Sequence, residues 1–208
     1  MNVGGYELHQ RGGGVQEGKN RGQRDNTFFA YTGRMYLQTI ASSTAIANTA
    51  ALTPFDQQPT IPKGLMNVVG ARVTIEMWGH YGTTGTPTLS VIVRLDDPTT
   101  GDTVASNSTA AAPNNATGWS WRSRSGFVVR SIGGAATLQP FPCSLTLANN
   151  TTGIAFVNQV MTSTITPTNS NVAHIVYGVV QWGAADPANT IQVDGMSIEV
   201  DYPYTTTP

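Results

Sequence analysis

Charged side chains are scarce in this chain of 208 residues. Asp, Glu, Lys and Arg together make up 11% of the sequence, less than half of the usual share of about 25%. Because the formal net charge is −1, the chain lacks the excess of positive charge with which proteins bind nucleic acids. We therefore expect no nucleic-acid partner, and we expect Thr, Asn, Ser and Gln to solvate much of the surface.

Cysteine and long hydrophobic runs are nearly absent as well. Cys143 is the only cysteine, which excludes an intramolecular disulfide and a zinc site built from several thiolates. No apolar run approaches the roughly 20 residues that a membrane-spanning helix requires. The sequence thus predicts neither a membrane partner nor a cofactor.

The first 26 residues contain few large aliphatic side chains and many glycines. Ordering glycines costs backbone entropy, and too few apolar residues are present here to offset that cost. Residues 1–26 are therefore predicted to form an extended N-terminal arm, disordered when free, and residues 27–208 a folded body. Because the charges of the arm nearly cancel, we expect it to bind a partner through backbone pairing and mixed salt bridges. Its candidate contact residues are Tyr6, Leu8, Arg11, Lys19, Arg21 and Arg24.

The arm also places Gly13, Gly18 and Lys19 at the spacing of a phosphate-binding loop. However, Asn20 stands where that loop needs a Ser or Thr to hold magnesium, and neither a predicted strand nor a predicted helix flanks it. We interpret these residues as part of the arm and not as a nucleotide site.

The body shows the alternation of apolar and polar residues that is typical of antiparallel sheets with one face on a core. Leu89, Val91, Val93 and Leu95 share one face of such a segment, and Met196, Ile198 and Val200 share a face of another. Strands are predicted at 35–41, 67–80, 88–96, 119–132, 137–147, 171–182 and 191–202, with shorter ones near Thr103 and Ile154, and a short helix or loop at 42–52. The prediction is an all-β fold, an antiparallel two-sheet sandwich with a jelly-roll topology preferred.

Two groups of side chains were weighed as chemical sites. Asp96, Asp97 and Asp102 in the stretch DDPTTGD could bind a cation, but their spacing matches no EF-hand and suits a turn, which we favour. Glu76 and His80 are predicted to share a strand face and form the only conceivable acid–base couple. Because no Ser or Cys with a positioned base accompanies them, we expect no enzymatic activity.

The segment WSWRSRSGFVVR, residues 119–130, is the most distinctive of the body. If it is extended, Trp and Phe lie on one face and Arg on the other, with Gly126 as the predicted position of a bulge. Either this is an ordinary sandwich strand with its aromatic residues in the core, or it is an interface, where Trp and Arg are enriched. The candidate interface residues are Trp119, Trp121, Arg122, Arg124 and Arg130. Trp119, Trp121, Trp78 and Tyr81 are also candidates for stacking on a sugar.

The arm, the body phrases 73–78 (VTIEMW) and 89–96 (LSVIVRLD), and the closing phrase 189–200 (NTIQVDGMSIEV) together resemble the cement, or decoration, proteins and minor capsid proteins of tailed bacteriophages. The resemblance implies a structural protein on the outer surface of the capsid, often a trimer, whose arm binds the major capsid protein. A fully extended arm of 26 residues spans up to about 85 Å at ~3.3 Å per residue, enough to reach a neighbouring capsomer.

Two other functions fit the same features. One is a carbohydrate- or receptor-binding module of a phage tail fibre or tail-associated protein, in which aromatic residues stack on a glycan. The other is the jelly-roll coat protein of a small virus. That second alternative favours a strongly basic arm to neutralise the genome, and the arm here is nearly neutral.

Removal of residues 1–26 tests the division into arm and body. We expect the truncated chain to keep the circular dichroism spectrum and cooperative unfolding of the full chain, because the arm adds little to a core. If the chain is a cement protein, the truncated form should no longer co-sediment with capsids. Undiminished co-sedimentation would refute anchoring by the arm.

Overall fold

A computed structural model describes residues 34–39, 41–108, 111–149, 153–159 and 164–203. The predicted arm, with its six candidate contact residues and its phosphate-loop spacing, lies outside these residues. The described residues form strands and turns, and they contain no helix that is long and apolar enough to cross a membrane.

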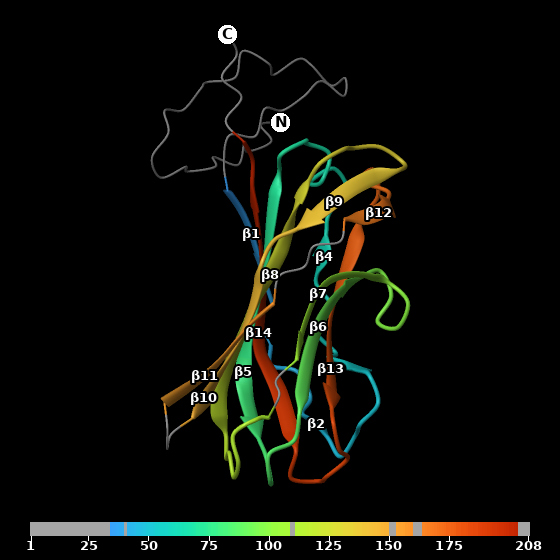
Figure 1. Cartoon of the computed structure of the whole chain (residues 1–208). Coiled ribbons are helices and arrows are strands. Elements are labelled where there is room, and N and C mark those ends of the chain that lie inside the picture. Colours follow the sequence, from blue (N-terminus) through green and yellow to red (C-terminus); the bar gives the residue numbers. More distant parts are fainter. Residues whose placement is uncertain (1–33, 40, 109–110, 150–152, 160–163, 204–208) are drawn as a thin grey trace, which may run out of the picture.

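The strands form two antiparallel sheets packed face to face (Figure 1). The large sheet has the order β1 (Arg34–Gln38), β14 (Thr190–Asp201), β5 (Arg72–Gly82), β8 (Trp119–Val129), β10 (Cys143–Asn149) and β11 (Gly153–Gln159). Short strands join it at its margins: β2 (Ile46–Ala47), β9 (Ala136–Pro140) and β12 (Ile165–Thr168). The small sheet has the order β3 (Thr53–Pro54), β13 (His174–Trp182), β6 (Leu89–Leu95) and β7 (Asp102–Ser108), with β4 (Thr60–Ile61) paired to β13.

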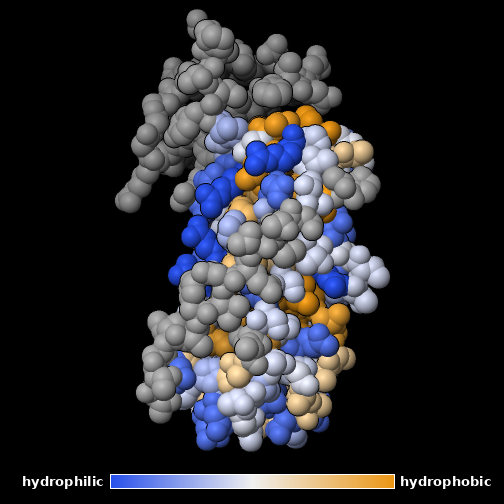
Figure 2. Space-filling view, viewed as in Figure 1, coloured by the Kyte–Doolittle hydropathy of each residue, from blue (hydrophilic) through white to orange (hydrophobic). Residues whose placement is uncertain are grey.

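The core lies between the two sheets and is built from alternate residues of their long strands. Val73, Ile75 and Met77 of β5 face it from the large sheet, and Leu89, Val91, Val93 and Leu95 of β6 face it from the small sheet. Figure 2 shows hydrophilic residues along the left side of the molecule, where the large sheet lies in Figure 1. The predicted all-β, antiparallel two-sheet sandwich is therefore confirmed.

Two local predictions need correction. The predicted strand 137–147 is interrupted at Phe141 and Pro142: β9 and β10 both pair with β8 in antiparallel fashion, but their registers differ by one residue, and proline cannot donate to a strand ladder. Of the two alternatives for 42–52, the loop is the correct one, except that Ile46 and Ala47 pair with β14 as strand β2, and Asn48 adopts a left-handed φ of 52° that ends the strand.

The bulge predicted at Gly126 is present on one side of β8 only. The pairing of β8 shifts by one residue between Arg124, opposite Ser144 of β10, and Phe127, opposite Pro140 of β9, whereas its pairing with β5 has no shift. Gly126 pairs in register with Thr74, and its missing side chain leaves room for the ring of Phe141, whose Cζ would lie 2.4 Å from a Cβ at this position. A further irregularity in the register lies in β14, between Val193 and Gly195. It reverses the alternation, so that Val193 on one side and Met196 on the other both face the core.

Gly79 of β5 lies opposite this bulge, and a Cβ there would stand only 1.9 Å from the main-chain oxygen of Gln192. We expect Gly79→Ala to lower the free energy of unfolding by about 1–3 kcal/mol, since the backbone of β14 must shift to admit a methyl group. Gly134→Ala is the matched control, because a Cβ at Gly134 meets no atom within 4 Å. Urea denaturation measures both, and equal stability of the two variants would contradict the tight contact.

Candidate functional site

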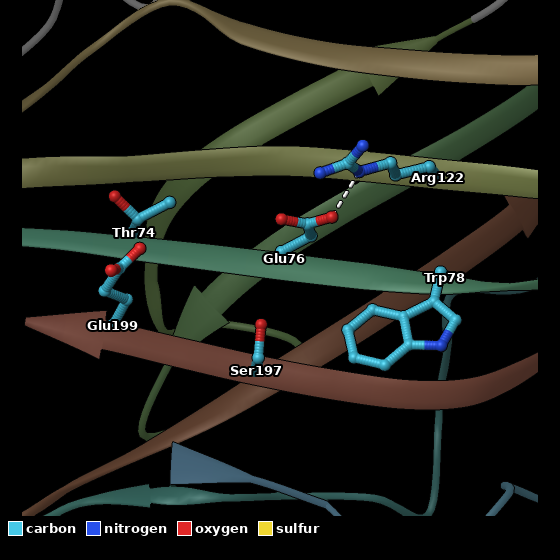
Figure 3. Close-up of a pocket in the computed structure, with 6 residues that line it drawn as sticks. All are labelled: Thr74, Glu76, Trp78, Arg122, Ser197 and Glu199. Atoms are coloured by element: carbon cyan, nitrogen blue, oxygen red, sulfur yellow. Dashed lines mark ion pairs between the residues drawn. The ribbon is translucent and has the colours of Figure 1, made fainter. Parts of the chain in front are cut away.

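The outer face of the large sheet carries a shallow depression at its centre (Figure 3). Residues of three neighbouring strands line it: Thr74, Glu76 and Trp78 of β5, Arg122 of β8, and Ser197 and Glu199 of β14. Alternation places them there, because the residues between them on the same strands, such as Ile75, Met77 and Ile198, point into the core. The antiparallel register then aligns Ser197 with Glu76 and Glu199 with Thr74.

Trp78 gives this polar face an aromatic surface. Its side chain is half-buried, and its ring packs against Gly195 of the neighbouring strand, where a Cβ would lie 2.3 Å from the Cζ2 atom of the ring. The missing side chain of Gly195, in the β14 bulge, therefore leaves the space in which the indole lies. A ring held in this way is already positioned before a ligand arrives, so little rotamer entropy is lost on binding.

An ion pair flanks the indole. Arg122 is the cross-strand partner of Trp78, and its Nε contacts the Oε1 atom of Glu76. The hydrogen bond to Glu76 raises the pKa of the Arg122 guanidinium above its ordinary value. Because the Arg122 side chain is 61% exposed, such a pair adds at most about 1 kcal/mol to stability. Its main effect is to present a fixed set of hydrogen-bond donors and acceptors beside the ring.

Glu76 and His80, the one acid–base couple that the sequence made conceivable, do not contact each other through the ion pairs that they form. Glu76 bonds Arg122, whereas the Nδ1 atom of His80 lies 2.6 Å from the Oδ2 atom of Asp194 in the β14 bulge. Both side chains do lie on the outer face, as predicted, but each has its own partner.

Trp121 and Tyr81, two of the residues suggested for sugar stacking, are core residues. Trp121 is 2% exposed, stacks on Phe55 with ring centroids 6.1 Å apart, and donates its indole N–H to the Gln192 oxygen at 3.0 Å. Tyr81 is 1% exposed and donates its hydroxyl to the Ala148 oxygen, and burial raises the pKa of Tyr81 to about 12. Neither ring is available to a partner at the surface, so for Trp121 the sandwich-strand interpretation is the correct one.

The other candidates on the segment 119–130 are spread over different surfaces. Trp119 is half-buried and packs edge-on against Tyr81 at 6.4 Å. Arg124 is exposed on the outer face, opposite Glu76 and two residues along β8 from Arg122. Arg130 is exposed beyond the end of β8. The structure thus brings Arg122 and Arg124 together near Trp78 and separates both from Trp119 and Arg130.

Each of the three carboxylates of DDPTTGD has its own hydrogen-bond partners. Asp96 accepts from Nδ1 of His174 at 2.7 Å and from the Ile175 N–H at 3.0 Å, and Asp102 accepts the Thr168 hydroxyl at 2.7 Å. Asp97 accepts the N–H groups of Thr100 and Thr99, which lowers the pKa of its carboxyl. The segment is a turn, and the described ranges contain no group of three or more His, Cys, Asp or Glu residues placed to hold a metal ion.

Comparison of the sequence with protein-family models and with curated protein sequences gives no match. Among solved structures, the fold is similar to a peanut lectin with a nine-residue peptide, at 8% identity and a TM-score of 0.34, over 86% of this chain and 96% of the lectin. It is similar to the CBM2 module of an evolved Dit protein of Lactobacillus casei BL23 phage J-1, at 13% identity and a TM-score of 0.30, over 71% of this chain and 70% of that one. A protein of unknown function from Shewanella oneidensis MR-1 gives 10% identity and a TM-score of 0.34, over 84% and 81% of the two chains. These likenesses concern the fold alone.

The assignment of Trp78 to the surface and Trp121 to the core predicts different losses of stability when each is replaced by alanine. Trp78→Ala should lower the free energy of unfolding by roughly 1 kcal/mol or less, because the ring lies on the outer face. Trp121→Ala should lower it by about 3–5 kcal/mol, because it leaves a cavity beside Phe55. Chemical denaturation followed by circular dichroism measures both, and an equal loss would contradict the assignment of Trp78 to the surface.

Proposed function

We propose that this protein is a carbohydrate-binding β-sandwich module that binds glycans on the outer face of its large sheet. The observation that carries the proposal is the Trp78 indole, fixed on a polar sheet face beside the Glu76–Arg122 pair. A sugar ring has apolar C–H faces and a rim of hydroxyls. An aromatic ring surrounded by charged and hydroxyl groups matches both parts, as in other ligand sites that combine an apolar wall with a few placed polar groups.

The polar residues have complementary roles in this proposal. The Glu76 carboxylate accepts hydrogen bonds from sugar hydroxyls, and the Arg122 guanidinium donates hydrogen bonds to their oxygens. Charged partners make such hydrogen bonds stronger than neutral ones. Since the lining residues lie on three paired strands and not on loops, the donor and acceptor positions are fixed to the precision that specific recognition requires.

A glycan array followed by calorimetry on a bound glycan tests the proposal. We expect Trp78→Ala to weaken binding by about 30-fold or more, the effect of losing a hot-spot residue worth 2 kcal/mol. Trp119→Phe is the control, because Trp119 packs on Tyr81 away from this face and should bind glycans as the unchanged protein does. Absence of any bound glycan, or equal binding by the Trp78→Ala variant, would refute the site.

A second proposal concerns attachment to a virus particle. We propose that the Gly-rich residues 1–26 anchor the body, as in a capsid cement protein on the outer surface of the virion with the major capsid protein as its partner. The near-neutral composition of the arm favours this, and β1, which follows the arm, is an edge strand of the large sheet. The two proposals are compatible, because the arm would attach the body and the Trp78 face would remain open. Neither proposal includes catalysis, and the co-sedimentation of the truncated chain distinguishes them.

A further inference from the structure

Positive and negative charges are divided between two strands on either side of the depression. The charged residues of β8 are both basic, and those of β14 are all acidic. They are Arg122 and Arg124 on β8, and Asp194, Glu199 and Asp201 on β14. Strand β5 lies between these two strands and carries Trp78. A ligand that stacks on Trp78 therefore has basic side chains on one side and acidic side chains on the other.

The two arginines of β8 differ in their contacts. Arg122 uses its Nε atom to pair with Glu76. Arg124 lies opposite Glu76 in the register, but its exposed guanidinium forms no ion pair or hydrogen bond with any of the described residues. On its other side it is opposite Ser144 of β10, which carries no charge. Because a guanidinium has five N–H donors, Arg124 keeps its full set of donors for a ligand.

This part of the sheet has an excess of positive charge. The adjacent strands β5, β8 and β10 contain three arginines, Arg72, Arg122 and Arg124, and one acidic residue, Glu76. Three positive charges less one negative charge leave an excess of two, with His80 neutral, although the whole chain has a net charge of −1. Charge of one sign over a surface concentrates ligands of the opposite sign. The Trp78 side of the depression therefore favours a ligand that carries a negative charge.

We propose that the ligand of this site is an anionic glycan, whose carboxylate or sulfate group binds Arg124 while a sugar ring stacks on Trp78. This inference rests on the glycan site proposed above. Trp78 and Arg124 are diagonal neighbours, because Trp78 is opposite Arg122 and Arg124 is opposite Glu76. Diagonal neighbours in a sheet lie about 7–8 Å apart, a separation that one acidic sugar and the long arginine side chain together can bridge.

The chemistry of the two sides fixes the orientation of such a ligand. The planar guanidinium of Arg124 donates two parallel hydrogen bonds to two oxygens of a carboxylate or sulfate. The acidic residues of β14 lie on the other side of β5, and they repel the same group. The acid group therefore points towards β8, and the uncharged hydroxyls of the sugar point towards Ser197 and Thr74.

Matched glycans that differ only at carbon 6 of the sugar test this inference. Each hexose glycan is compared in three forms, with a hydroxymethyl group, a carboxylate or a sulfate ester at that carbon, first on an array and then by calorimetry. We expect one of the two anionic forms to bind about tenfold more tightly than the neutral form at low salt, the effect of one hydrogen-bonded contact between charged groups. Because Arg124 is exposed, this preference should decrease as the salt concentration is raised. The two anionic forms distinguish a carboxylate ligand from a sulfate ligand.

Removal of the charge at position 124 tests the role of this arginine. Arg124→Gln keeps a hydrogen-bonding side chain without the positive charge, and we expect the anionic and neutral forms then to bind with similar affinity. Arg130→Gln is the matched control, because Arg130 is exposed beyond the end of β8 and its replacement removes the same charge away from the depression. The control should keep the preference for the anionic form. Circular dichroism confirms that each variant is folded.

The outcomes separate this inference from the proposal on which it rests. Equal binding of the three forms, with binding still lost in Trp78→Ala, would overturn the preference for anionic glycans and leave the glycan site standing. A preference that survives Arg124→Gln, or that Arg130→Gln abolishes equally, would overturn the role of Arg124. Binding of none of the three forms would instead refute the proposed glycan function itself.

Discussion

The close approach of Gly79 to the main-chain oxygen of Gln192 is the constraint on which the central strands depend. No side chain fits between them, so β5 and β14 can keep this register only with glycine at position 79. The bulge that the contact accompanies reverses the alternation of β14. Without that reversal, either Ile191 and Val193 or Met196 and Ile198 would face solvent, and a large part of the core would be lost.

The same bulge also determines how side chains lie on the outer face of the sheet. It places Gly195 beside Trp78, and the absence of a side chain there allows the indole to lie against the sheet. His80 bonds Asp194, which lies within the irregularity between Val193 and Gly195. A local backbone feature thus determines both which residues are buried and which aromatic ring is presented next to the Glu76–Arg122 pair.

Alternation along the chain was enough to predict the fold class and the orientation of the long strands. The apolar residues of β6 and β14 are buried as their spacing indicates, and Arg122 and Arg124 are exposed on the face predicted for them. The features that could not be predicted are those set by residues distant in the sequence. Gly126 makes room for Phe141, which lies on a different strand connection, and the order of strands depends on pairings between residues far apart in sequence.

The candidate site could be predicted only in part, for the same reason. Trp78 and Arg122 are separated by 43 intervening positions and meet only because β5 pairs with β8. For Trp121, alternation separated the ring from the arginines of its strand but left two interpretations open, a core residue and an interface residue. Two partners distant in sequence explain why it is buried: the ring of Phe55 and the main-chain oxygen of Gln192, which lies on β14 of the same sheet. The spacing along one strand predicts on which face of the sheet a residue lies. Its contacts depend on which strands pair with that strand.

The fit between Trp78 and Gly195 has a consequence for how such a surface can evolve. Residues 76, 122, 197 and 199 lie on the outer face and can change without altering the core, so the preference for a ligand can diverge while the fold is kept. Trp78 is different, because any side chain at position 195 would displace its ring. Related sequences that lose the glycine at 195 should therefore also lose the tryptophan at 78, and the two positions should vary together.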